Sequence, residues 1–455
     1  MKSNSRRKFI KKSALASSIF IVPRHVLGGN GYTAPSDKLN IAGIGVGGRG
    51  ASVLKGCESE NIVALCDVDF SYASKTFKRY PDAKVYKDYR VMLDNQNDID
   101  AVVIGTPDHT HAVITMLAMG KGKHVYCEKP LAHTVFETRT ITEAAKKYNI
   151  QTQMGNQGRS SDEIRDLKEW LEDGAIGDVT EIYAWTDRPR GGKPWSHFDV
   201  KAMSKETPEI PDTMDWDLWL GPVRHRPYHP DYHPSKWRAW LDFGTGAMGD
   251  MGCHILDPSF YALDLGAPSE VQATSTHWLP EVSSQTYPLA SIVRMNFPER
   301  GSKPPVKLTW SDGRILPPVP KEFAKGQKFS PSGAMLIGTD GIMIHGSHGA
   351  RDLTILPNKK MQAYNKPEKT ITRVPMTKEG QWGHQNDWIR ACKEGKTSCS
   401  SFDYGGPLTE MALLGMIAIQ VKDQRLEWDS KNLRFTNNED ANKLLHIEYR
   451  KGWSL

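Results

Sequence analysis

The chain has 455 residues, of which 25% are charged and 38% apolar, a balance typical of a globular protein with two or three domains. The formal charge of +6 comes from the first 34 residues, which hold seven cations and no acids, leaving 52 cations against 53 acids elsewhere. That near-neutral remainder argues against nucleic-acid binding, and no apolar run reaches the ~18–20 residues that a transmembrane helix needs.

The N-terminal segment resembles an export signal. Two arginines, Arg6 and Arg7, precede the modestly apolar run 14–22, as in twin-arginine signals. We therefore exclude residues 1–34 from the fold and predict a periplasmic protein, with cleavage anywhere from Ala16 to Ala34. A basic tail with no targeting role is the alternative.

Residues 37–157 alternate between short apolar strands and helices. The strands are expected at 39–42, 61–66 and 101–104, with helices at 109–119 and 134–148. Continuous apolar strands separated by helices indicate a parallel sheet covered on both faces. The sequence therefore predicts an α/β, doubly wound Rossmann domain over residues 37–157.

A glycine-rich turn follows the first expected strand. Gly45, Gly47 and Gly50 fit the pattern GxGxxG, with Gly48 and Arg49 inside the same turn. Small residues there let the backbone approach a pyrophosphate at the start of a helix. An alternative frame begins at Gly43, but the later frame places the first glycine at the strand end.

Asp67 ends the second expected strand, about 20 residues after the turn. A carboxylate there can accept a hydrogen bond from a ribose 2′-hydroxyl and repel a 2′-phosphate. Because no arginine directly follows Asp67, NAD is favoured over NADP as the cofactor.

Residues 158–455 show a different pattern of predicted elements. A helix is expected at 161–173 and another at 412–420, with strands in the ranges 179–185, 270–278, 288–297, 305–310 and 341–345. Residues 186–245 are irregular and rich in Pro, Gly, Trp and His, and so long an irregular stretch is usually functional. We predict a second, α+β domain over 158–455 with a mostly antiparallel, open sheet.

Three short motifs carry the chemistry: 106–111 (TPDHTH), 127–130 (CEKP) and 250–254 (DMGCH). Asp250 and His254 are four residues apart, so on a helix they share a face, where a carboxylate can orient an imidazole acting as a general base. Lys129, next to a nicotinamide, can polarise a hydroxyl. Alternatively, Asp250 caps a helix and His254 is a core histidine.

Together these motifs resemble the signatures of the Gfo/Idh/MocA oxidoreductase family, over residues 37 to about 450. The segments 216–222 and 237–246 resemble an exported bacterial subgroup of it. The resemblance implies that Lys129, Asp250 and His254 surround the sugar hydroxyl being oxidised, and that the Lys129–Pro130 bond is cis. It also implies a carbohydrate substrate and a homo-oligomer, a dimer or tetramer.

The remaining cofactor contacts are expected along the same strand ends. The resemblance implies that Glu128 binds the cofactor ribose and that Thr106, Pro107, His109 and His111 lie on the nicotinamide side. One of the two histidines is expected to be structural.

The substrate side is expected among the tryptophans of the second domain and their polar neighbours, because flat aromatic rings pack against sugars. Most of these tryptophans are expected to be core residues. The candidate substrate contacts are Trp185, Arg188, His197, Trp237, Arg238 and Asp257, the last being equally a helix cap. His225, His229 and His233 are four apart, but intervening prolines argue against a metal site, so none is predicted.

The sequence leaves several points open. Cys392 and Cys399 can form a disulfide only if the protein is exported. The leading hypothesis is an exported, NAD-dependent oxidoreductase acting on a secondary hydroxyl of a sugar or glycoside. NAD-dependent glycoside cleavage by transient oxidation and elimination is the alternative, and a non-catalytic sugar-binding protein is a third.

Overall fold

Six parallel strands form the first sheet, in the order β3-β2-β1-β4-β5-β6. The computed structural model describes residues 37–189, 206–276, 280–377 and 383–455. The strands are β1 (Asn40–Ile44), β2 (Asn61–Cys66), β3 (Lys84–Tyr86), β4 (Ala101–Ile104), β5 (His124–Cys127) and β6 (Thr152–Met154). This order reverses direction between β1 and β4, as in doubly wound dinucleotide-binding sheets. The predicted Rossmann fold is confirmed.

Successive side chains of these strands point to opposite faces of the sheet and belong to two different cores. Ile41 packs with Val53 and Leu54 on one face, beneath α3 (Arg49–Lys55) and α4 (Phe70–Arg79). Its neighbour Ala42 belongs to the core on the other face, beneath α5 (Tyr89–Asn95), α6 (Asp108–Gly120) and α7 (Val135–Lys147). Since both faces are apolar, the strands read as continuous apolar runs.

The second sheet has nine strands in the order β13-β12-β11-β7-β10-β9-β8-β14-β15. β7 and β10 pair in parallel and the other named pairs are antiparallel, as predicted for a mostly antiparallel sheet. The strands are β7 (Val179–Thr186), β8 (Glu270–Ser275), β9 (Ser291–Phe297), β10 (Val306–Ser311), β11 (Ser332–Gly338), β12 (Gly341–Gly346), β13 (Thr354–Leu356), β14 (Arg425–Asp429) and β15 (Arg434–Phe435).

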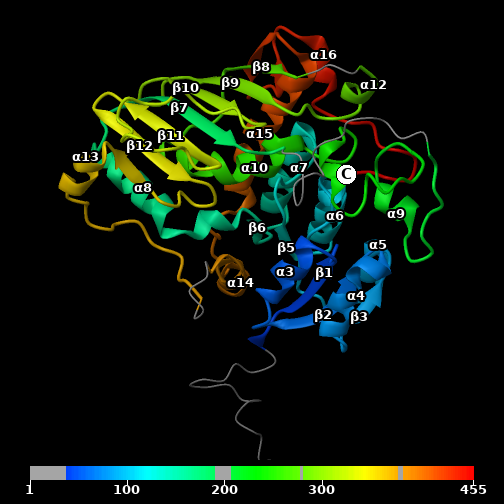
Figure 1. The fold of residues 1–455 in the computed structure, drawn as a ribbon. Coiled ribbons are helices and arrows are strands. Elements are labelled where there is room, and N and C mark those ends of the chain that lie inside the picture. The colour runs from blue at the N-terminus through cyan, green and yellow to red at the C-terminus, as the bar shows by residue number, and fades with distance from the viewer. Residues whose placement is uncertain (1–36, 190–205, 277–279, 378–382) are drawn as a thin grey trace, which may run out of the picture.

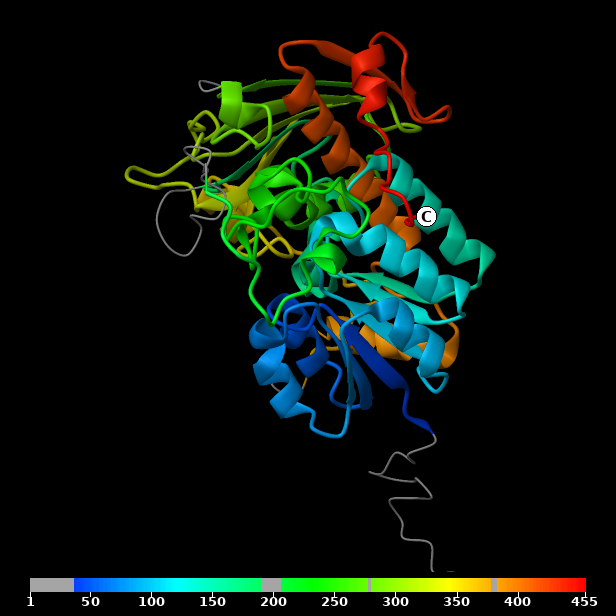
Figure 2. The same cartoon turned by 90° about the vertical axis from the view of Figure 1, so that its right-hand side faces the viewer.

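The C-terminal half adds further helices. They are η2 (Gln157–Ser160), α8 (Asp162–Glu172), α9 (Trp216–Leu220), η4 (Lys236–Ala239), α10 (Gly246–Ile255), α11 (Asp257–Ala262), α12 (Pro280–Ser283), α13 (Asn358–Ala363), α14 (His384–Glu394), α15 (Phe402–Val421) and α16 (Glu439–Lys443). Among them, α8, α10 and α15 lie between the large sheet and the first sheet (Figures 1 and 2). The long helix α15 contacts β8 and β9 of the large sheet and also α7 of the Rossmann domain. It therefore ties the two sheets together.

One helix of the second half belongs to the first core. Trp388 and Ile389 of α14 pack with Ile41, Leu54 and Tyr126, so the chain returns to cover the first sheet. Figure 1 shows α14 beside the blue strands, apart from the large sheet. The two halves therefore do not pack separately at the predicted boundary of residue 157. Helix α14 of the second half covers part of the same face of the first sheet as α3.

A second crossing links residues 211–243, here called the covering segment, to the Rossmann domain. Backbone bonds join Phe70 N to Thr213 O (3.1 Å) and Asp215 N to Val68 O (2.9 Å). Aromatic residues of the segment form a small core of their own, with Val68 packed against it. The segment is thereby fixed over the residues that follow β2.

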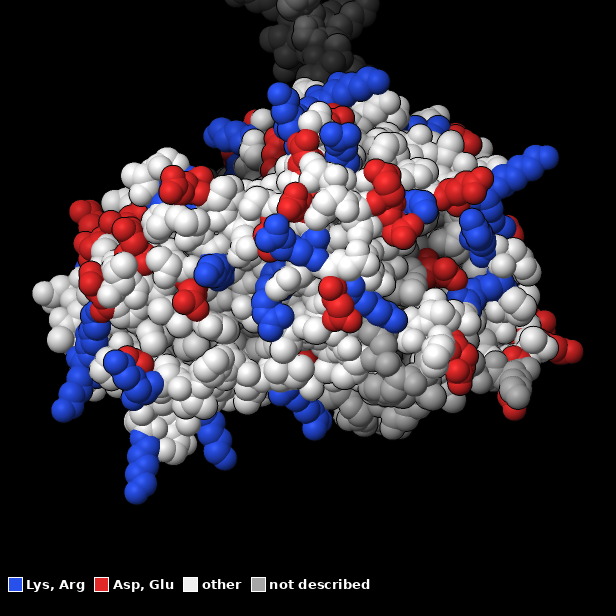
Figure 3. Space-filling model, turned by 90° about the horizontal axis from the view of Figure 1, so that it is seen from above, with Lys and Arg blue, Asp and Glu red and all other residues white. Residues whose placement is uncertain are grey.

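The described surface and cysteines add three findings. On the face seen in Figure 3, basic and acidic side chains are interspersed. Among the described residues, no helix has the length and apolar character needed to span a membrane. Cys392 and Cys399 are both free thiols, so the disulfide that the sequence left open is not formed.

Candidate active site

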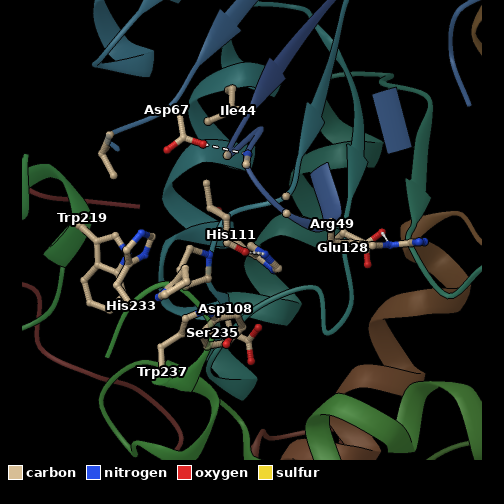
Figure 4. Close-up of a pocket in the computed structure, with 18 of the residues that line it drawn as sticks. Ile44, Arg49, Asp67, Asp108, His111, Glu128, Trp219, His233, Ser235 and Trp237 are labelled. Atoms are coloured by element: carbon tan, nitrogen blue, oxygen red, sulfur yellow. Dashed lines mark hydrogen bonds and ion pairs between the residues drawn. The ribbon is translucent and has the colours of Figure 1, made fainter. Parts of the chain in front are cut away.

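A cavity of about 310 Å³ lies where the two halves of the chain meet. Its walls come from the carboxyl ends of β1, β2, β4 and β5, from the covering segment and from α10. In parallel sheets with this strand order, ligands bind at that edge. Figure 4 shows Asp67, Arg49 and Glu128 on the sheet side of the cavity and Trp219, His233 and Trp237 across from them.

The glycine turn leaves backbone exposed to this cavity. Gly45 has a φ of +74°, which favours glycine, and a Cβ at Gly50 would lie 2.0 Å from the Gly45 carbonyl oxygen. A Cβ at Gly47 would meet the Tyr72 ring at 2.0 Å. These three positions are those of the preferred GxGxxG frame, and they leave the bare backbone that a pyrophosphate needs. The residues present fit a dinucleotide.

Asp67 holds the turn in shape. Its Oδ2 accepts hydrogen bonds from Val46 N (2.8 Å) and Gly47 N (3.1 Å). Burial raises the pKa of this carboxyl to about 6, although those backbone donors oppose the shift. Asp67 also lines the cavity, so its predicted contact with a ribose hydroxyl is sterically open and stays a prediction.

Lys129 and Asp250 form an ion pair at the base of the cavity. Lys129 Nζ donates to Asp250 Oδ1 and to the Asp250 carbonyl oxygen, both at 2.8 Å. Arg188 donates to Oδ2 at 2.6 Å, and Arg238 Nε lies 3.4 Å from Oδ1. Burial opposes the charged carboxylate, yet these three cations hold the pKa of Asp250 well below its ordinary value. The Lys129–Pro130 bond is cis, as the family resemblance implied.

Asp250 does not orient His254 as the i, i+4 spacing on α10 predicted. Both carboxylate oxygens face cations, which compete more strongly than an imidazole for a buried negative charge. His254 stacks instead on His348, with ring centroids 4.0 Å apart. Burial, the stacked His348 and the nearby charge of Lys129 lower the pKa of His254 well below 6.5. His254 is therefore a neutral base.

Glu128 is engaged by the glycine turn. Arg49 Nε donates to Glu128 Oε1 at 3.0 Å, and Arg49 also donates to Gln157 Oε1 at 3.1 Å. Glu128, Arg49 and Gln157 line the cavity beside the glycines. Thr106 and Pro107, at the end of β4, line it too, as does Gly48.

The two histidines of the 106–111 motif differ in role. The nitrogens of His111 face the carbonyl oxygens of Pro130 (2.8 Å) and Thr106 (2.9 Å), and its ring lines the cavity. Burial opposes protonation of this ring, but Cys127, Asp108 and the Pro130 carbonyl raise its pKa to about 10. The imidazolium satisfies both carbonyl oxygens.

The cofactor contact predicted for His109 is wrong. This residue is fully buried outside the cavity lining, and its ring nitrogens face the carbonyl oxygens of Trp219 (2.9 Å) and Phe243 (3.2 Å). Burial lowers the pKa of His109 to about 3, which keeps the ring neutral. It fastens the covering segment to α6, a long-range role that the motif does not reveal.

Of the predicted substrate contacts, Trp237 and Arg238 line the cavity. The Arg238 guanidinium lies over the Trp237 ring, 4.2 Å from its centroid. Arg188 reaches the site through Asp250. His197 lies outside the described residues.

Two predicted contacts are wrong. Trp185 is fully buried in the small core on the far side of β7, where its indole donates to Ser330 O (2.9 Å). Asp257 is buried too, accepting from Asn156 (3.0 Å) and Tyr404. Alternation along β7 and the turn from α10 into α11 point these side chains away from the cavity.

Several cavity residues escaped the sequence prediction: Tyr72, Asp108, Trp219, His233 and Ser235. The Pro-, Trp- and His-rich composition of 186–245 signalled a functional segment without identifying them. His233 Nε2 lies 3.0 Å from Asp69 Oδ2, pairing that ring with a carboxylate. Among the described residues, no His, Cys, Asp and Glu cluster could hold a metal ion.

Two family models match parts of the chain. The model described as an oxidoreductase family with an NAD-binding Rossmann fold matches residues 39–156. The model for the C-terminal alpha/beta domain of that family matches residues 161–281. Together they cover more than half of the chain, and the first identifies NAD as the cofactor of the Rossmann domain.

Curated relatives are similar over part of their length. Levoglucosan dehydrogenase of Pseudarthrobacter phenanthrenivorans is 27% identical over 223 residues, 48% of this chain and 46% of the relative. D-glucoside 3-dehydrogenase of Escherichia coli is 27% identical over 217 residues, 47% of this chain and 50% of the relative. The chain spans about half the length of the curated relatives it matches.

Solved structures share the fold. Levoglucosan dehydrogenase in complex with NADH has a TM-score of 0.56 at 19% identity, covering 86% of this chain and 99% of that one. Aldose-aldose oxidoreductase from Caulobacter crescentus, complexed with glycerol, has a TM-score of 0.56 at 17% identity, covering 86% of this chain and 100% of that one. With both domain models matched and the glycine turn, Lys129, Asp250 and His254 in one cavity, the chain belongs to the Gfo/Idh/MocA oxidoreductase family.

Proposed function

We propose that this protein is an NAD-dependent oxidoreductase that acts on a secondary hydroxyl of a sugar or glycoside outside the cytoplasm. The observation that carries the proposal is the placement of Lys129, Asp250 and His254 in the cavity that also holds the glycine turn. When bound, NAD⁺ supplies the acceptor for the hydride that leaves the hydroxyl-bearing carbon.

Lys129 is suited to polarise the hydroxyl oxygen. An ammonium has three donor protons, and Asp250 receives two of them through its carbonyl and its Oδ1. The third is available to an oxygen in the cavity. The two hydrogen bonds to Asp250 fix the direction of the Lys129 side chain.

His254 is suited to take the hydroxyl proton. Its ring is neutral at pH 7 because burial lowers its pKa, so one ring nitrogen keeps a lone pair that can accept the proton. Its Nδ1 is buried and has no partner among the described residues. Lys129 as donor and His254 as acceptor thus divide the two tasks that oxidation of an alcohol requires.

The names of the relatives support a sugar substrate. Levoglucosan dehydrogenase and D-glucoside 3-dehydrogenase are named for carbohydrates, and the latter name specifies a single ring carbon. In this chain the rings of Trp219 and Trp237 line the cavity opposite the glycine turn, where they can pack against the C–H face of a pyranose. A secondary ring hydroxyl, as on C3 of a glucoside, is the proposed target.

The proposal includes a cofactor that stays bound. Arg6 and Arg7, followed by the apolar run 14–22, favour twin-arginine export, which carries folded proteins to a compartment without a pool of free NAD. The covering segment lies over the residues after β2, where a bound dinucleotide would be enclosed. A cofactor retained in this way must be recycled in place, either by a second sugar or by reversal of the hydride transfer within one turnover.

The first experiment identifies the nucleotide that the protein carries and the sugars that change its redox state. The purified protein is denatured and the released nucleotide identified, and the native protein is mixed with glucosides, levoglucosan and inositols. We expect about one NAD(H) per chain, with its redox state changed by at least one sugar. Denaturation that releases no nicotinamide nucleotide, together with no reaction when NAD is added, would overturn the proposal.

Aryl glycosides separate net oxidation from elimination. Transient oxidation followed by elimination releases the aglycone with no net NADH, whereas net oxidation leaves the glycosidic bond intact. We expect reduction of the cofactor without aglycone release, because levoglucosan dehydrogenase and D-glucoside 3-dehydrogenase, to which the chain is similar, are named for net oxidation. Aglycone release with no net reduction would instead assign the protein to glycoside cleavage.

A further inference from the structure

We propose that His348, in the turn after β12, is a positioning residue that holds the imidazole of His254 in its working orientation. The inference rests on the proposed function of His254 and adds a residue 94 positions away in sequence that neither of the matched domain models includes. It is carried by three observations: ring stacking, a turn with left-handed backbone, and a dedicated contact that docks this turn.

The two rings lie face to face. Their centroids are 4.0 Å apart and their planes differ by 24°. His254 receives no orienting contact from Asp250, whose oxygens face Lys129, Arg188 and Arg238. The stacked ring is therefore the described contact that fixes the plane of the His254 imidazole.

The turn that presents His348 has an uncommon backbone. His348, Ala350 and Asp352 have φ values of +57°, +58° and +56°, and Gly349 between them has +96°. Three non-glycine residues in left-handed conformation within five positions are rare, and such strain concentrates at functional sites. A relaxed turn of the same length would not require it.

The turn is docked against η2, at the edge of the cavity. Ser161 Oγ donates to the Gly349 carbonyl oxygen at 2.5 Å. A Cβ on Gly158 would lie 2.5 Å from both Gly349 N and the carbonyl carbon of His348, so the two backbones touch. Ser347 Oγ and His348 Nδ1 are 2.9 Å apart, which fixes the ring itself. Each contact restrains the ring that faces His254.

Stacking also suits the proton transfer. The groups near the pair are the cations Lys129, Arg49, Arg188 and Arg351 and the carboxylate of Asp250. Burial and the stacked His348 both lower the pKa of His254, so the pair keeps this base neutral until it accepts the proton.

Two matched variants test the proposal. His348→Asn removes the aromatic face while tolerating the left-handed backbone, and His348→Phe keeps a flat ring that cannot titrate. We expect His348→Asn to lower kcat by roughly tenfold or more with KM within about twofold, and to raise the isotope effect of a C-deuterated sugar. His348→Phe should keep kcat within about threefold of the wild type.

Proton NMR of the His254 imidazole tests the contact without substrate. Because the His348 ring is stacked on His254, we expect its ring current to shift the His254 signals in the wild type. We expect that shift to vanish in His348→Asn and to persist in His348→Phe. If no sugar is oxidised by the wild type, the proposed function fails while this measurement still decides the contact.

The proposal is overturned if His348→Asn keeps the wild-type kcat, isotope effect and His254 signals, or if His348→Phe is as impaired as His348→Asn. Melting temperature and bound NAD show whether either variant is folded. If one of them is not folded, Gly158→Ala replaces it, because the added Cβ would push the backbone of His348 and Gly349 away from η2. We expect this variant to lose kcat in the same way, with unchanged KM. Wild-type kcat in that variant would equally count against the proposal.

Discussion

Lys129 and His254 line one cavity and have different parts in it. Lys129, Arg188 and Arg238 surround Asp250 and hold the pKa of its carboxyl well below the ordinary value. Burial, the stacked His348 and Lys129 lower the pKa of His254, which keeps that ring neutral. Lys129 is therefore the hydrogen-bond donor to the substrate oxygen and His254 the proton acceptor.

Replacing Lys129 by methionine keeps most of the side-chain volume and removes its charge. Because the oxygen of the reacting hydroxyl then loses its donor, we expect kcat to fall by roughly 10²–10³-fold. Steady-state turnover of the best sugar measures this. Lys307→Met, on an exposed position of β10, is the control and should retain activity. Comparable turnover in the two variants would remove Lys129 from the chemistry.

The pH dependence of kcat/KM reports the base. The folded-state pKa of His254 is depressed, so the ring is neutral above 6.5 and becomes protonated only as the pH falls through a lower value. We expect kcat/KM to persist below pH 6.5 and to be lost on further acidification. An acidic limb centred above 6.5, in a protein shown to be folded, would contradict a neutral, buried His254.

Among the elements, the covering segment decides how the cofactor is held. It contacts the Rossmann domain through backbone bonds near Asp69 and through His233, whose ring pairs with Asp69 and packs edge-on against Tyr72 at 5.3 Å. Tyr72 also lies over the glycines of the turn. The segment therefore restrains the residues that line the nucleotide end of the cavity.

Replacing His233 by alanine should loosen this cover. A buried hydrogen bond to a charged group contributes about 1.5–3 kcal/mol, so we expect NAD to dissociate roughly tenfold faster or more. The nucleotide retained after prolonged dialysis measures the change. His446→Ala, on an exposed position near the C-terminus, serves as the control. Equal retention in the two variants would show that His233 does not hold the cover closed.

Elements whose residues carry a local signal were predictable from the sequence. The Rossmann strands are visible in the sequence as apolar runs. Gly45, Asp67, Thr106 and Lys129 follow the ends of these strands, which a parallel sheet brings to one edge. The resemblance brought Lys129 near Asp250, but the expectation that Asp250 orients His254 was wrong. Helical spacing shows which residues share a face of α10, and it does not show which distant cations compete for the carboxylate. For the same reason Trp185 and Asp257 were misplaced and His348 was missed.

At the scale of the whole molecule, the two halves are interlocked. α14 returns from the second half to complete the first core, and α15 runs from the large sheet to α7. The cavity lies between halves that share their packing, so its walls depend on both. Unfolding is expected to involve both sheets together.

Trp388 tests this interlocking. Its side chain is fully buried against Tyr126 of β5, so Trp388→Ala should lower the free energy of unfolding by about 3–5 kcal/mol. Denaturant unfolding, followed separately by bound NAD and by circular dichroism, measures it. We expect both probes to shift together. A shift confined to one probe would mean that the two halves unfold independently.

A single turnover shows whether a bound nicotinamide, Lys129 and a sugar hydroxyl meet in one cavity. Protein carrying its own NAD⁺, with none added, is mixed with a glucoside while the absorbance of reduced nicotinamide is recorded. We expect one burst, equal to the bound cofactor, in the wild type and no burst of the same rate in Lys129→Met. The absence of a burst from protein shown to hold NAD⁺, across glucosides, levoglucosan and inositols, or a burst equally fast in Lys129→Met, would contradict this expectation.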